Sequence, residues 1–417
     1  MKSLLYNLLI QTYGLALRLA SLFNKKAKQF LAGRKDLFDK LSTEFKDNQA
    51  PVAWFHCASL GEFEQGRPVI EALKEEMPEY KILLTFFSPS GYEIRKDYQG
   101  ADFVYYLPLD TWQNARRFIG IISPAVAFFV KYEFWHNYIL ELKRKNIPII
   151  SFSAIFRSNQ LFFKPWGGFY RNILHNISHI FVQNDASFNL LKSINITQTS
   201  VSGDTRFDRV WKICQQVNPM EEVAAFKADS KLMVVGSSWP EDTEVLIPFI
   251  NACKEIKFII APHEIKDADM ASVENKLQQP SIRYSSLNGH DSHRYQVLII
   301  DNVGMLSSLY QFGEFAYVGG GFGKGLHNIL EAATFGLPVF FGDKNYAKFQ
   351  EARDLVARRG AFTVSDSASL SAKFSKLNND PTAWSRTSTI NSDYVKHHTG
   401  ATEKILDHCK NLLLHAG

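Results

Sequence analysis

The 417-residue sequence has few cysteines, and their placement argues against two classes of cross-linked protein. The four cysteines, at positions 57, 214, 253 and 409, are far apart and form no C-x-x-C pair. A disulfide framework or a zinc site needs cysteines at close, regular spacing. The sequence therefore favours a protein of a reducing, cytoplasmic compartment that holds no structural metal.

Long runs of proline, glycine, serine or like charge are also lacking, and no internal repeat of fixed period is present. Such runs mark disordered chains, and fixed periods mark repeat proteins. With 46% apolar and 21% charged residues, the composition is that of a globular protein. The length suits two domains, each with its own core.

Two standard phosphate-binding fingerprints are missing from the most glycine-rich loop, "VGGGFGKG" at residues 318–325. A Walker A motif requires Ser or Thr after Gly-Lys, whereas Gly325 follows Lys324. The dinucleotide pattern G-x-G-x-x-G requires glycine where Lys324 or Leu326 stands. ATPase and dehydrogenase functions therefore lose their main support.

The chain as a whole lacks a strong excess of positive or negative charge, because a net charge of +5 is modest for this length. Much of the charge is local: residues 2–46 hold nine Lys or Arg against three acids, beside the most apolar terminus of the chain. This pairing indicates an anionic membrane surface rather than nucleic acid. We therefore expect residues 1–48 to form a membrane-associated segment.

The N-terminal stretch "MKSLLYNLLIQTYGLALRLASLFNKKAK" predicts an amphipathic helix. Polar or small residues recur at steps of three and four, opposite a broad Leu/Ile/Phe face. Arg18 within the polar stripe argues against a spanning helix, and no small-x-small cleavage site follows to indicate export. We expect a helix lying in the cytoplasmic face of a membrane, with Lys25, Lys26 and Lys28 at the headgroups. The alternative is a helix docked on the protein's own core.

From Val52 onward, short apolar runs alternate with helical patterns, which predicts two parallel α/β sheets. Runs such as "VAWFHCAS", "KILLTFF" and "IPIISFSA" place one Rossmann-like domain at residues 49–215. Runs such as "KLMVVGSS", "IKFIIAPH" and "FAYVGG" place a second at residues 216–417. Ligands of open parallel sheets bind at the carboxyl ends of the strands, where this sequence keeps its polar residues. Two such sheets facing a cleft are the architecture of nucleotide-sugar glycosyltransferases and of sugar-nucleotide epimerases.

The glycine-rich loop leads into a predicted helix that starts near Asn328, and together they suit a phosphate. Glycines let the backbone pass close to a ligand, and a helix start offers unpaired N–H groups to an anion. Glu331 lies three residues after Asn328, one turn along the same face. Its carboxylate either closes a capping box onto Asn328 or accepts hydrogen bonds from the ribose hydroxyls of a nucleotide.

Five segments, in order along nearly the whole chain, resemble those of the 3-deoxy-D-manno-octulosonic acid (Kdo) transferases. These are inverting enzymes of Gram-negative bacteria that move Kdo from CMP-Kdo to lipid A. The resemblance implies a GT-B glycosyltransferase at the inner membrane, with CMP-Kdo as donor, a lipid A precursor as acceptor and no metal. The segments are "HCASLGEFEQGRPVIEAL", "KYEFWHN", "GDTRFD", "GSSWPEDTE" and "GGGFGKGLHNILEAATFGLPVFFGDKNYAKFQEA".

The resemblance implies catalytic roles for three residues. Glu62 in "SLGEF" matches the base that takes the proton of the acceptor hydroxyl, which is a poor nucleophile near neutral pH. Its alternative role is that of an acid at a helix start. Glu133 in "KYEFWHN" and Arg206 in "GDTRFD" match positions that stabilise the transition state. The family has Lys in place of Arg206, whose planar group permits a bidentate grip on a carboxylate or phosphate. Lys324 is a further candidate cation.

The family's nucleotide contacts fall in the second half of the chain, with two departures. The family commonly has Pro-Arg where this chain has Pro-His, and Met-Gly-Glu where it has Val-Gly-Met. Backbone groups and an imidazole that titrates near neutrality are left to make those contacts. The matching positions are Pro262, His263, Val303, Gly304, Met305, Asn328, Ile329, Leu330 and Glu331.

The roles of three histidines and of one aromatic segment stay open at this point. His56, His136 and His327 are expected beside the cleft in structural roles. The aromatic segment "IFRSNQLFFKPWGGFY" either lines the entry of an acylated acceptor or belongs to the core. Two rival functions remain: another glycosyltransferase or epimerase of the same architecture, and a membrane scaffold without catalysis.

Overall fold

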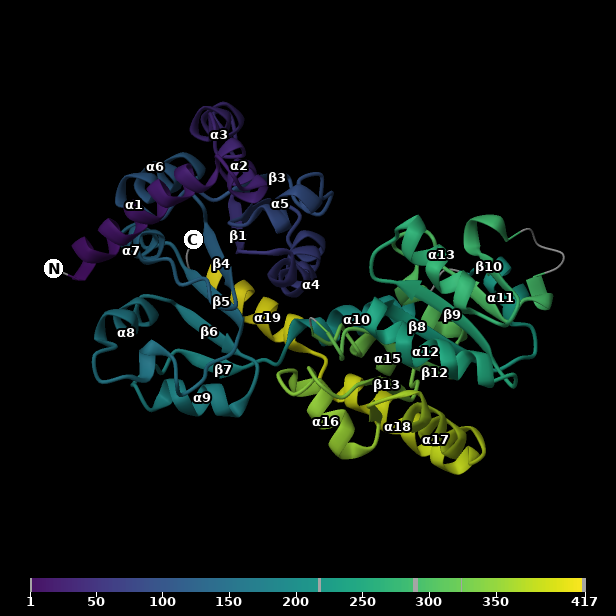
Figure 1. Cartoon of the computed structure of the whole chain (residues 1–417). Coiled ribbons are helices and arrows are strands. Elements are labelled where there is room, and N and C mark those ends of the chain that lie inside the picture. Colours follow the sequence, from purple (N-terminus) through teal and green to yellow (C-terminus); the bar gives the residue numbers. More distant parts are fainter. Residues whose placement is uncertain (1, 217–218, 288–291, 324, 415–417) are drawn as a thin grey trace. The chain divides into compact units, whose positions relative to one another are not determined.

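The computed structural model describes residues 2–216, 219–287, 292–323 and 325–414 and divides the chain into two compact units (Figure 1). Unit 1 comprises Met1–Asp208 and Thr399–Gly417, and unit 2 comprises Arg209–His398. The C-terminal helix α19 (Ala401–Leu414), which the sequence pattern placed with the second domain, therefore belongs to unit 1. Its start is held by Asp208, whose carboxylate accepts the backbone N–H groups of Gly400 at 2.6 Å and Thr402 at 2.7 Å.

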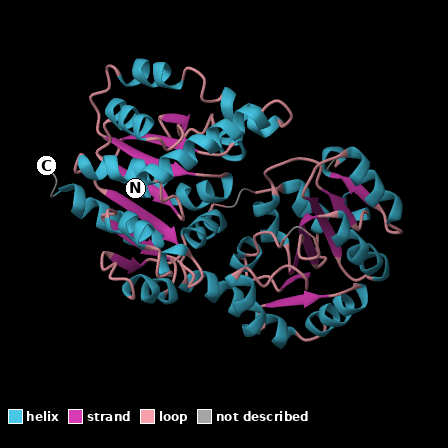
Figure 2. Ribbon diagram, turned by 60° about the vertical axis from the view of Figure 1, so that its left-hand side comes forward, coloured by secondary structure: helices cyan, strands magenta, loops and turns pink. Residues whose placement is uncertain are grey.

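Unit 1 is built on a seven-stranded parallel sheet of order β3-β2-β1-β4-β5-β6-β7. Helices cover both faces of this sheet (Figure 2). The strands are β1 (Val52–Cys57), β2 (Lys81–Phe86), β3 (Phe103–Tyr106), β4 (Val126–Val130), β5 (Ile149–Ala154), β6 (His179–Val182) and β7 (Thr199–Val201). The remaining helices are α1 (Lys2–Ala20), α2 (Lys25–Ala32), α3 (Leu37–Phe45), α4 (Leu60–Glu76), α5 (Pro89–Arg95), α6 (Trp112–Ile122), α7 (His136–Arg144), α8 (Gly168–His175), α9 (Asp185–Lys192) and α10 (Thr205–Gln215), which runs on into unit 2.

Strand β1 shows why these runs are continuously apolar. All six of its residues are buried, because side chains alternate between two covered faces of the sheet. Trp54 packs in a cluster with residues of α3, α6 and α7, whereas Phe55 packs with residues of α4 and α19. Strands β3 and β7, which the sequence pattern missed, are short and contain residues that are only partly buried.

Unit 2 repeats the plan with a second seven-stranded parallel sheet of order β10-β11-β9-β8-β12-β13-β14. Its core includes Met233, Phe258, Phe315 and Tyr317 from the three central strands. The strands are β8 (Leu232–Ser238), β9 (Lys257–Pro262), β10 (Ser281–Arg283), β11 (Val297–Ile299), β12 (Phe315–Val318), β13 (Val339–Gly342) and β14 (Ala361–Val364). The helices are α11 (Glu221–Lys227), α12 (Pro240–Ala252), α13 (Asp267–Lys276), α14 (Leu306–Leu309), α15 (Leu330–Thr334), α16 (Gln350–Arg358), α17 (Ser367–Asn378) and α18 (Pro381–His397).

Each sheet has a switch point beside its first strand, where the chain builds the sheet outward in one direction and later in the other. In unit 1 the chain continues from β1 to β2 on one side, and β4 pairs with β1 on the other. In unit 2 the corresponding strand is β8, which pairs with β9 and β12. Ligands of such sheets bind in the crevice beyond the carboxyl ends of the strands at this switch point. We therefore expect ligands to bind at the carboxyl ends of β1 and β4 in unit 1, and of β8 and β12 in unit 2.

Helix α1 docks on unit 1 through a face that carries both polar and apolar residues. Tyr6 donates a hydrogen bond to Asp110 Oδ2 at 2.6 Å, and Asn137 Nδ2 donates to Asn7 Oδ1 at 3.1 Å. At Gly14 the helix comes so close to the sheet layer that a Cβ would lie 2.9 Å from a Leu109 methyl group. The helix thus does dock on the protein, as the alternative expected. The docked face mixes polar and apolar residues, because Ile10 and Leu17 are half-buried whereas Gln11 and Arg18 of the polar stripe are exposed.

The apolar side of α1 and of the turn that follows stays exposed. His136, which was expected beside the cleft, lies beneath α1, with Nε2 3.2 Å from Ser3 Oγ. Among the described residues, no helix is long and apolar enough to cross a membrane. The exposed apolar side chains are Leu4, Leu5, Leu8, Leu9, Tyr13, Leu15, Leu19, Leu22 and Phe23, the last 93% exposed.

Candidate active site

Two carboxylates meet at the switch point of unit 1. Glu62 stands in the first turn of α4, just after β1, and Glu133 follows β4. Glu62 Oε2 accepts the backbone N–H of Ser59 at 2.9 Å and the Ser59 hydroxyl at 3.2 Å, so this oxygen caps the helix start. No described residue hydrogen-bonds the other oxygen, Oε1. A role as catalytic base and a role at the helix start are therefore compatible, because one carboxylate oxygen caps the helix and the other is left for a base.

The surroundings of Glu62 raise its pKa above the ordinary value. The largest cause is burial, and the second is the negative charge of Glu133. His56 and Lys131 act in the opposite direction, as does the hydrogen bond from Ser59. A carboxylate with a raised pKa is a stronger base, which suits proton abstraction near neutral pH.

Glu133 is held by Trp135 and lies beside His56. Trp135 donates its indole N–H to Glu133 Oε2 at 2.7 Å, and His56 Nε2 lies 3.3 Å from the same oxygen. The side chain of Glu133 is only 11% exposed, and His56 is fully buried at the end of β1. Sequence reasoning placed Glu133 at the site but missed the contact with His56, for which the one signal was a histidine near the end of a buried strand.

The tautomer of His56 follows from its neighbours. Thr85 Oγ1 donates its only proton to the carbonyl oxygen of Phe55 at 3.2 Å and accepts the indole N–H of Trp54 at 2.8 Å. Since that hydroxyl has no proton left, His56 Nδ1, 2.9 Å away, must be the donor to it. The core thus orients His56 so that Nε2 faces Glu133.

Lys131 is a residue of this site that sequence reasoning missed. It is the first residue after β4, and its φ of 65° lies in the left-handed region. Such a conformation costs a non-glycine residue about 1–3 kcal/mol and occurs often at functional sites. Its positive charge lowers the pKa of Glu62 and so partly offsets the effect of Glu133.

Arg206 is linked to the helix that carries Glu62. Its guanidinium contacts Asp204 Oδ2 through Nε at 2.9 Å and Nη2 at 2.8 Å. Asp204 also accepts a hydrogen bond at 3.3 Å from Gln65, which lies three residues after Glu62 on α4. Asp204 therefore offsets part of the charge of Arg206. Lys324, the other candidate cation, lies outside the described residues.

In unit 2, the glycine-rich loop after β12 is tied to the start of α12 by a buried carboxylate. Asp242 is fully buried and accepts the backbone N–H groups of Gly320 and Trp239, both at 2.9 Å, and the hydroxyl of Tyr317 at 2.9 Å. A Cβ on Gly319 would lie 2.3 Å from the carbonyl oxygen of Ser237, so only glycine fits where the loop passes β8. Loop and strand end thus form one rigid surface.

The predicted nucleotide residue His263 lies in a stack of three rings at this surface. Its ring centroid is 4.3 Å from that of Trp239 and 4.4 Å from that of His327. Its backbone N–H also donates to the carbonyl oxygen of Ser238 at 2.9 Å. The ends of β8, β9 and β12 are joined here, and sequence reasoning had not singled out Trp239.

Glu331, another predicted nucleotide residue, is contacted by helix α14 and by the loop before α15. Ser307, two residues after Met305, donates to Glu331 Oε2 at 2.6 Å, and Asn328 Nδ2 donates to Oε1 at 3.2 Å. The bond from Asn328 comes from its side-chain amide, and the N-cap of α15 is Ile329, so the capping box expected between Asn328 and Glu331 does not form. The remaining predicted positions divide by burial: Ile329 and Leu330 have fully buried side chains, Pro262 is half-buried, and Val303, Gly304 and Asn328 are exposed.

One expectation for this region is wrong. The helix predicted near Asn328 is α15, which begins at Leu330 and has only five residues. Asn328 Oδ1 also accepts the N–H of Leu330 at 3.1 Å, so one of the N–H groups expected to be open to an anion already has a partner. A helix this short has a weak dipole, and the loop itself becomes the better candidate for holding a phosphate.

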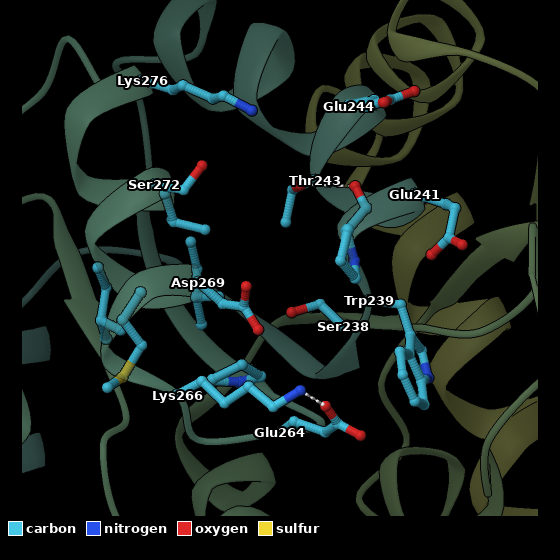
Figure 3. A pocket seen from close by; sticks show the side chains of 16 residues that line it. Ser238, Trp239, Glu241, Thr243, Glu244, Glu264, Lys266, Asp269, Ser272 and Lys276 are labelled. Atoms are coloured by element: carbon cyan, nitrogen blue, oxygen red, sulfur yellow. Dashed lines mark hydrogen bonds and ion pairs between the residues drawn. The ribbon is translucent and has the colours of Figure 1, made fainter.

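A cavity of about 480 Å³ opens between α12 and α13 beside this surface (Figure 3). Its floor includes the apolar side chains of Ile260 and Ile299. Ser238 and Asp269 point into it, and Lys266 pairs with Glu264 at its edge (Figure 3). The sequence showed polar residues after β8 and β9 but not that two helices leave a cavity between them. Its lining combines charged side chains with apolar ones.

Comparisons with known proteins find one family model and several curated relatives of the same name. Residues 34–209 match the family model described as 3-Deoxy-D-manno-octulosonic-acid transferase (kdotransferase). The chain is 28% identical to a 3-deoxy-D-manno-octulosonic acid transferase of Chlamydophila psittaci over 70% of this chain and 69% of that protein. It is 27% identical to the enzyme of that name from Aquifex aeolicus over 78% and 85% of the two chains.

Solved structures with less sequence identity show the same fold. UDP-GlcNAc 2-epimerase from Neisseria meningitidis aligns with a TM-score of 0.61 at 16% identity, covering 86% of this chain and 99% of that one. MurG from Acinetobacter baumannii aligns with a TM-score of 0.55 at 11% identity, covering 87% and 99%.

The two parallel seven-stranded sheets and these likenesses show a fold of the GT-B type. Within that fold, residues 34–209 resemble the family of 3-deoxy-D-manno-octulosonic acid transferases, and the curated relatives at 27% and 28% identity carry the same name.

Proposed function

We propose that this protein transfers Kdo from CMP-Kdo to a lipid A precursor, by direct displacement with inversion and without a metal. Glu62 takes the proton of the acceptor hydroxyl while CMP leaves from the opposite face of the anomeric carbon. The observation that carries this proposal is the pairing of Glu62 with Glu133 at the switch point of unit 1, where burial and that charge raise the pKa of Glu62. Glu133 and Arg206 are assigned to stabilise the transition state.

Unit 2 is assigned to the donor. The close approach of backbone at Gly319 and Gly320, the imidazole of His263 and the carboxylate of Glu331 suit the phosphate, the base and the ribose of a nucleotide in turn. Glu331 keeps lone pairs for ribose hydroxyls beside its two present bonds. Kdo itself carries a carboxylate, for which Arg206 and Lys324 are the assigned cations.

The direct test is product analysis by mass spectrometry. Purified protein is incubated with CMP-Kdo and a lipid A precursor, and in parallel with UDP-sugars. We expect Kdo addition from CMP-Kdo alone. Turnover of a UDP-sugar without turnover of CMP-Kdo would overturn the proposal.

We further propose that the acceptor is met at the cytoplasmic face of the inner membrane. The exposed leucines of α1 lie beside Lys25, Lys26 and Lys28, which are themselves exposed. Arg34, in contrast, is not part of this surface, because it is largely buried and donates to the backbone oxygens of Leu107 and Phe87. An apolar face beside lysines suits an anionic bilayer.

Replacing Lys25, Lys26 and Lys28 by Gln is expected to weaken binding to vesicles that contain anionic lipid. Each lysine near such a surface contributes about 1 kcal/mol, so the loss is roughly 100-fold in the partition coefficient. Sedimentation with anionic and with neutral vesicles measures it. The matched control, Lys40→Gln, changes an exposed lysine of α3 and should leave partitioning unchanged. Equal loss on neutral vesicles would contradict the electrostatic argument.

Glu133→Gln is expected to shift the acid limb of the pH profile of kcat/KM toward lower pH. A general base must be deprotonated, so activity falls as pH drops through the pKa of Glu62. The charge of Glu133 raises that pKa, and removing the charge lowers it. Initial rates between pH 4 and pH 9 measure the limb. A limb that stays in place or moves to higher pH would refute the coupling of the two carboxylates.

A further inference from the structure

The hydrogen bond between Trp239 and His327 determines which nitrogen of the histidine carries the proton. Trp239 Nε1 lies 2.8 Å from His327 Nε2. An indole N–H is only a donor, so Nε2 must accept, which requires a neutral imidazole with its proton on Nδ1. His327 is therefore held as the Nδ1–H tautomer.

The ring of His327 is fixed in the glycine-rich loop. Its backbone N–H donates to the carbonyl oxygen of Gly319 at 3.1 Å, and a Cβ on Gly320 would lie 3.1 Å from His327 Cδ2. The stacked ring of His263 restricts it further. Tautomer and orientation are therefore set before any ligand binds.

Nδ1 of His327 is available to a ligand. Within the described residues no group accepts its proton, and it is absent from the set of buried polar atoms that lack a partner, so it keeps access to solvent. Burial lowers the pKa of His327 to about 4, with His263 as the second cause, so the neutral form persists near neutral pH. The result is a preorganised neutral donor at the ends of β8 and β12.

We propose that His327 donates its Nδ1–H to an anionic oxygen of the phosphate of the bound nucleotide, and that Trp239 is the positioning residue that fixes this tautomer. This inference rests on the proposed function, because it assumes a nucleotide donor on unit 2. The glycine-rich loop supplies the close approach that a phosphate needs, and His327 supplies a donor of fixed direction. A neutral donor binds the phosphate without introducing a charge into this partly buried position.

The test compares CMP with cytidine, which lacks the phosphate, by calorimetry on the full-length protein. Trp239→Phe keeps an aromatic ring in the stack but replaces the indole by a smaller ring without an N–H. We expect the affinity for CMP to fall roughly 10- to 100-fold, as for loss of a hydrogen bond to a charged group, with cytidine binding changed less than about twofold. Trp384→Phe is the matched control, because it removes an indole bond to the carbonyl oxygen of Glu314 elsewhere in unit 2.

Two substitutions at His327 sharpen the test. Asn places its amide N–H where Nδ1 stands, so His327→Asn should keep CMP affinity within about threefold, whereas His327→Gln should lose it as Trp239→Phe does. Nitrogen-15 NMR of the histidine rings should show His327 as Nδ1–H in the free protein and a changed tautomer in Trp239→Phe.

The inference and the proposed function fail in different ways. An Nε2–H tautomer in the wild type, or unchanged CMP affinity in Trp239→Phe and His327→Gln, would overturn the inference while a preference of the wild type for CMP over cytidine stands. Absence of that preference, together with no turnover of CMP-Kdo, would overturn the proposed function and the inference with it.

Discussion

Glu62→Gln is expected to lower the rate of Kdo transfer by about 10²- to 10⁴-fold, the usual contribution of a general base. The amide cannot take the proton of the acceptor hydroxyl. It can still accept the backbone N–H of Ser59, because Gln serves as well as Glu at this position of a capping box. The variant should therefore fold and bind CMP as the wild type does, and the loss should appear in kcat.

The control is Glu75→Gln, which changes an exposed carboxylate on the same helix α4. Initial rates with saturating CMP-Kdo, and CMP affinity by calorimetry, separate catalysis from binding. Transfer at the wild-type rate by a folded Glu62→Gln protein would remove Glu62 from the mechanism. A parallel loss of CMP affinity would instead show that the substitution disturbed the fold.

Asp242→Ala is expected to destabilise unit 2 by about 3–5 kcal/mol, since it leaves several buried donors without an acceptor. The carboxylate accepts from the backbone of Gly320 and Trp239 and from the hydroxyl of Tyr317 at a fully buried position. Water cannot easily replace it there. The glycine-rich loop loses its tie to α12 as well, so CMP affinity should fall together with stability.

Urea unfolding followed by fluorescence measures this loss. Asp393→Ala changes an exposed carboxylate on α18 and should shift the free energy of unfolding by less than about 0.5 kcal/mol. An unfolding midpoint for Asp242→Ala equal to that of the control would show that the three donors find other partners. Such a result would remove Asp242 as the anchor of the loop.

Much of the fold was readable because parallel strands covered on both faces need continuous apolar runs. Strands β1 and β8 were predicted for that reason, and all six residues of β1 are buried. Strands β3, β7, β10 and β14 were not, because they have only three or four residues and include partly buried ones. Helix α15 was predicted to start too early, since the Asn328 side chain that signals a helix start bonds to the N–H of Leu330.

The candidate site was likewise predictable only in part. The sequence pointed to Glu62, Glu133 and His263, because motifs are local and polar residues after strands are visible in one dimension. It did not show that His56 faces Glu133, that Lys131 takes a left-handed conformation or that Trp239 bonds to His327. Each of these features depends on segments that are far apart in the chain. The strand order of the sheet brings those segments together.

The sequence by itself determined the alternation of strand and helix, the resemblance to a known family and the identities of the main polar side chains, since these depend on periodicity and local motifs. Only the tertiary structure decided which face of α1 is docked, which oxygen of Glu62 is engaged and which nitrogen of His327 carries a proton. The physical reason is that burial and hydrogen-bond geometry belong to pairs of groups. A linear pattern identifies each group, and the packed sheets determine its partner.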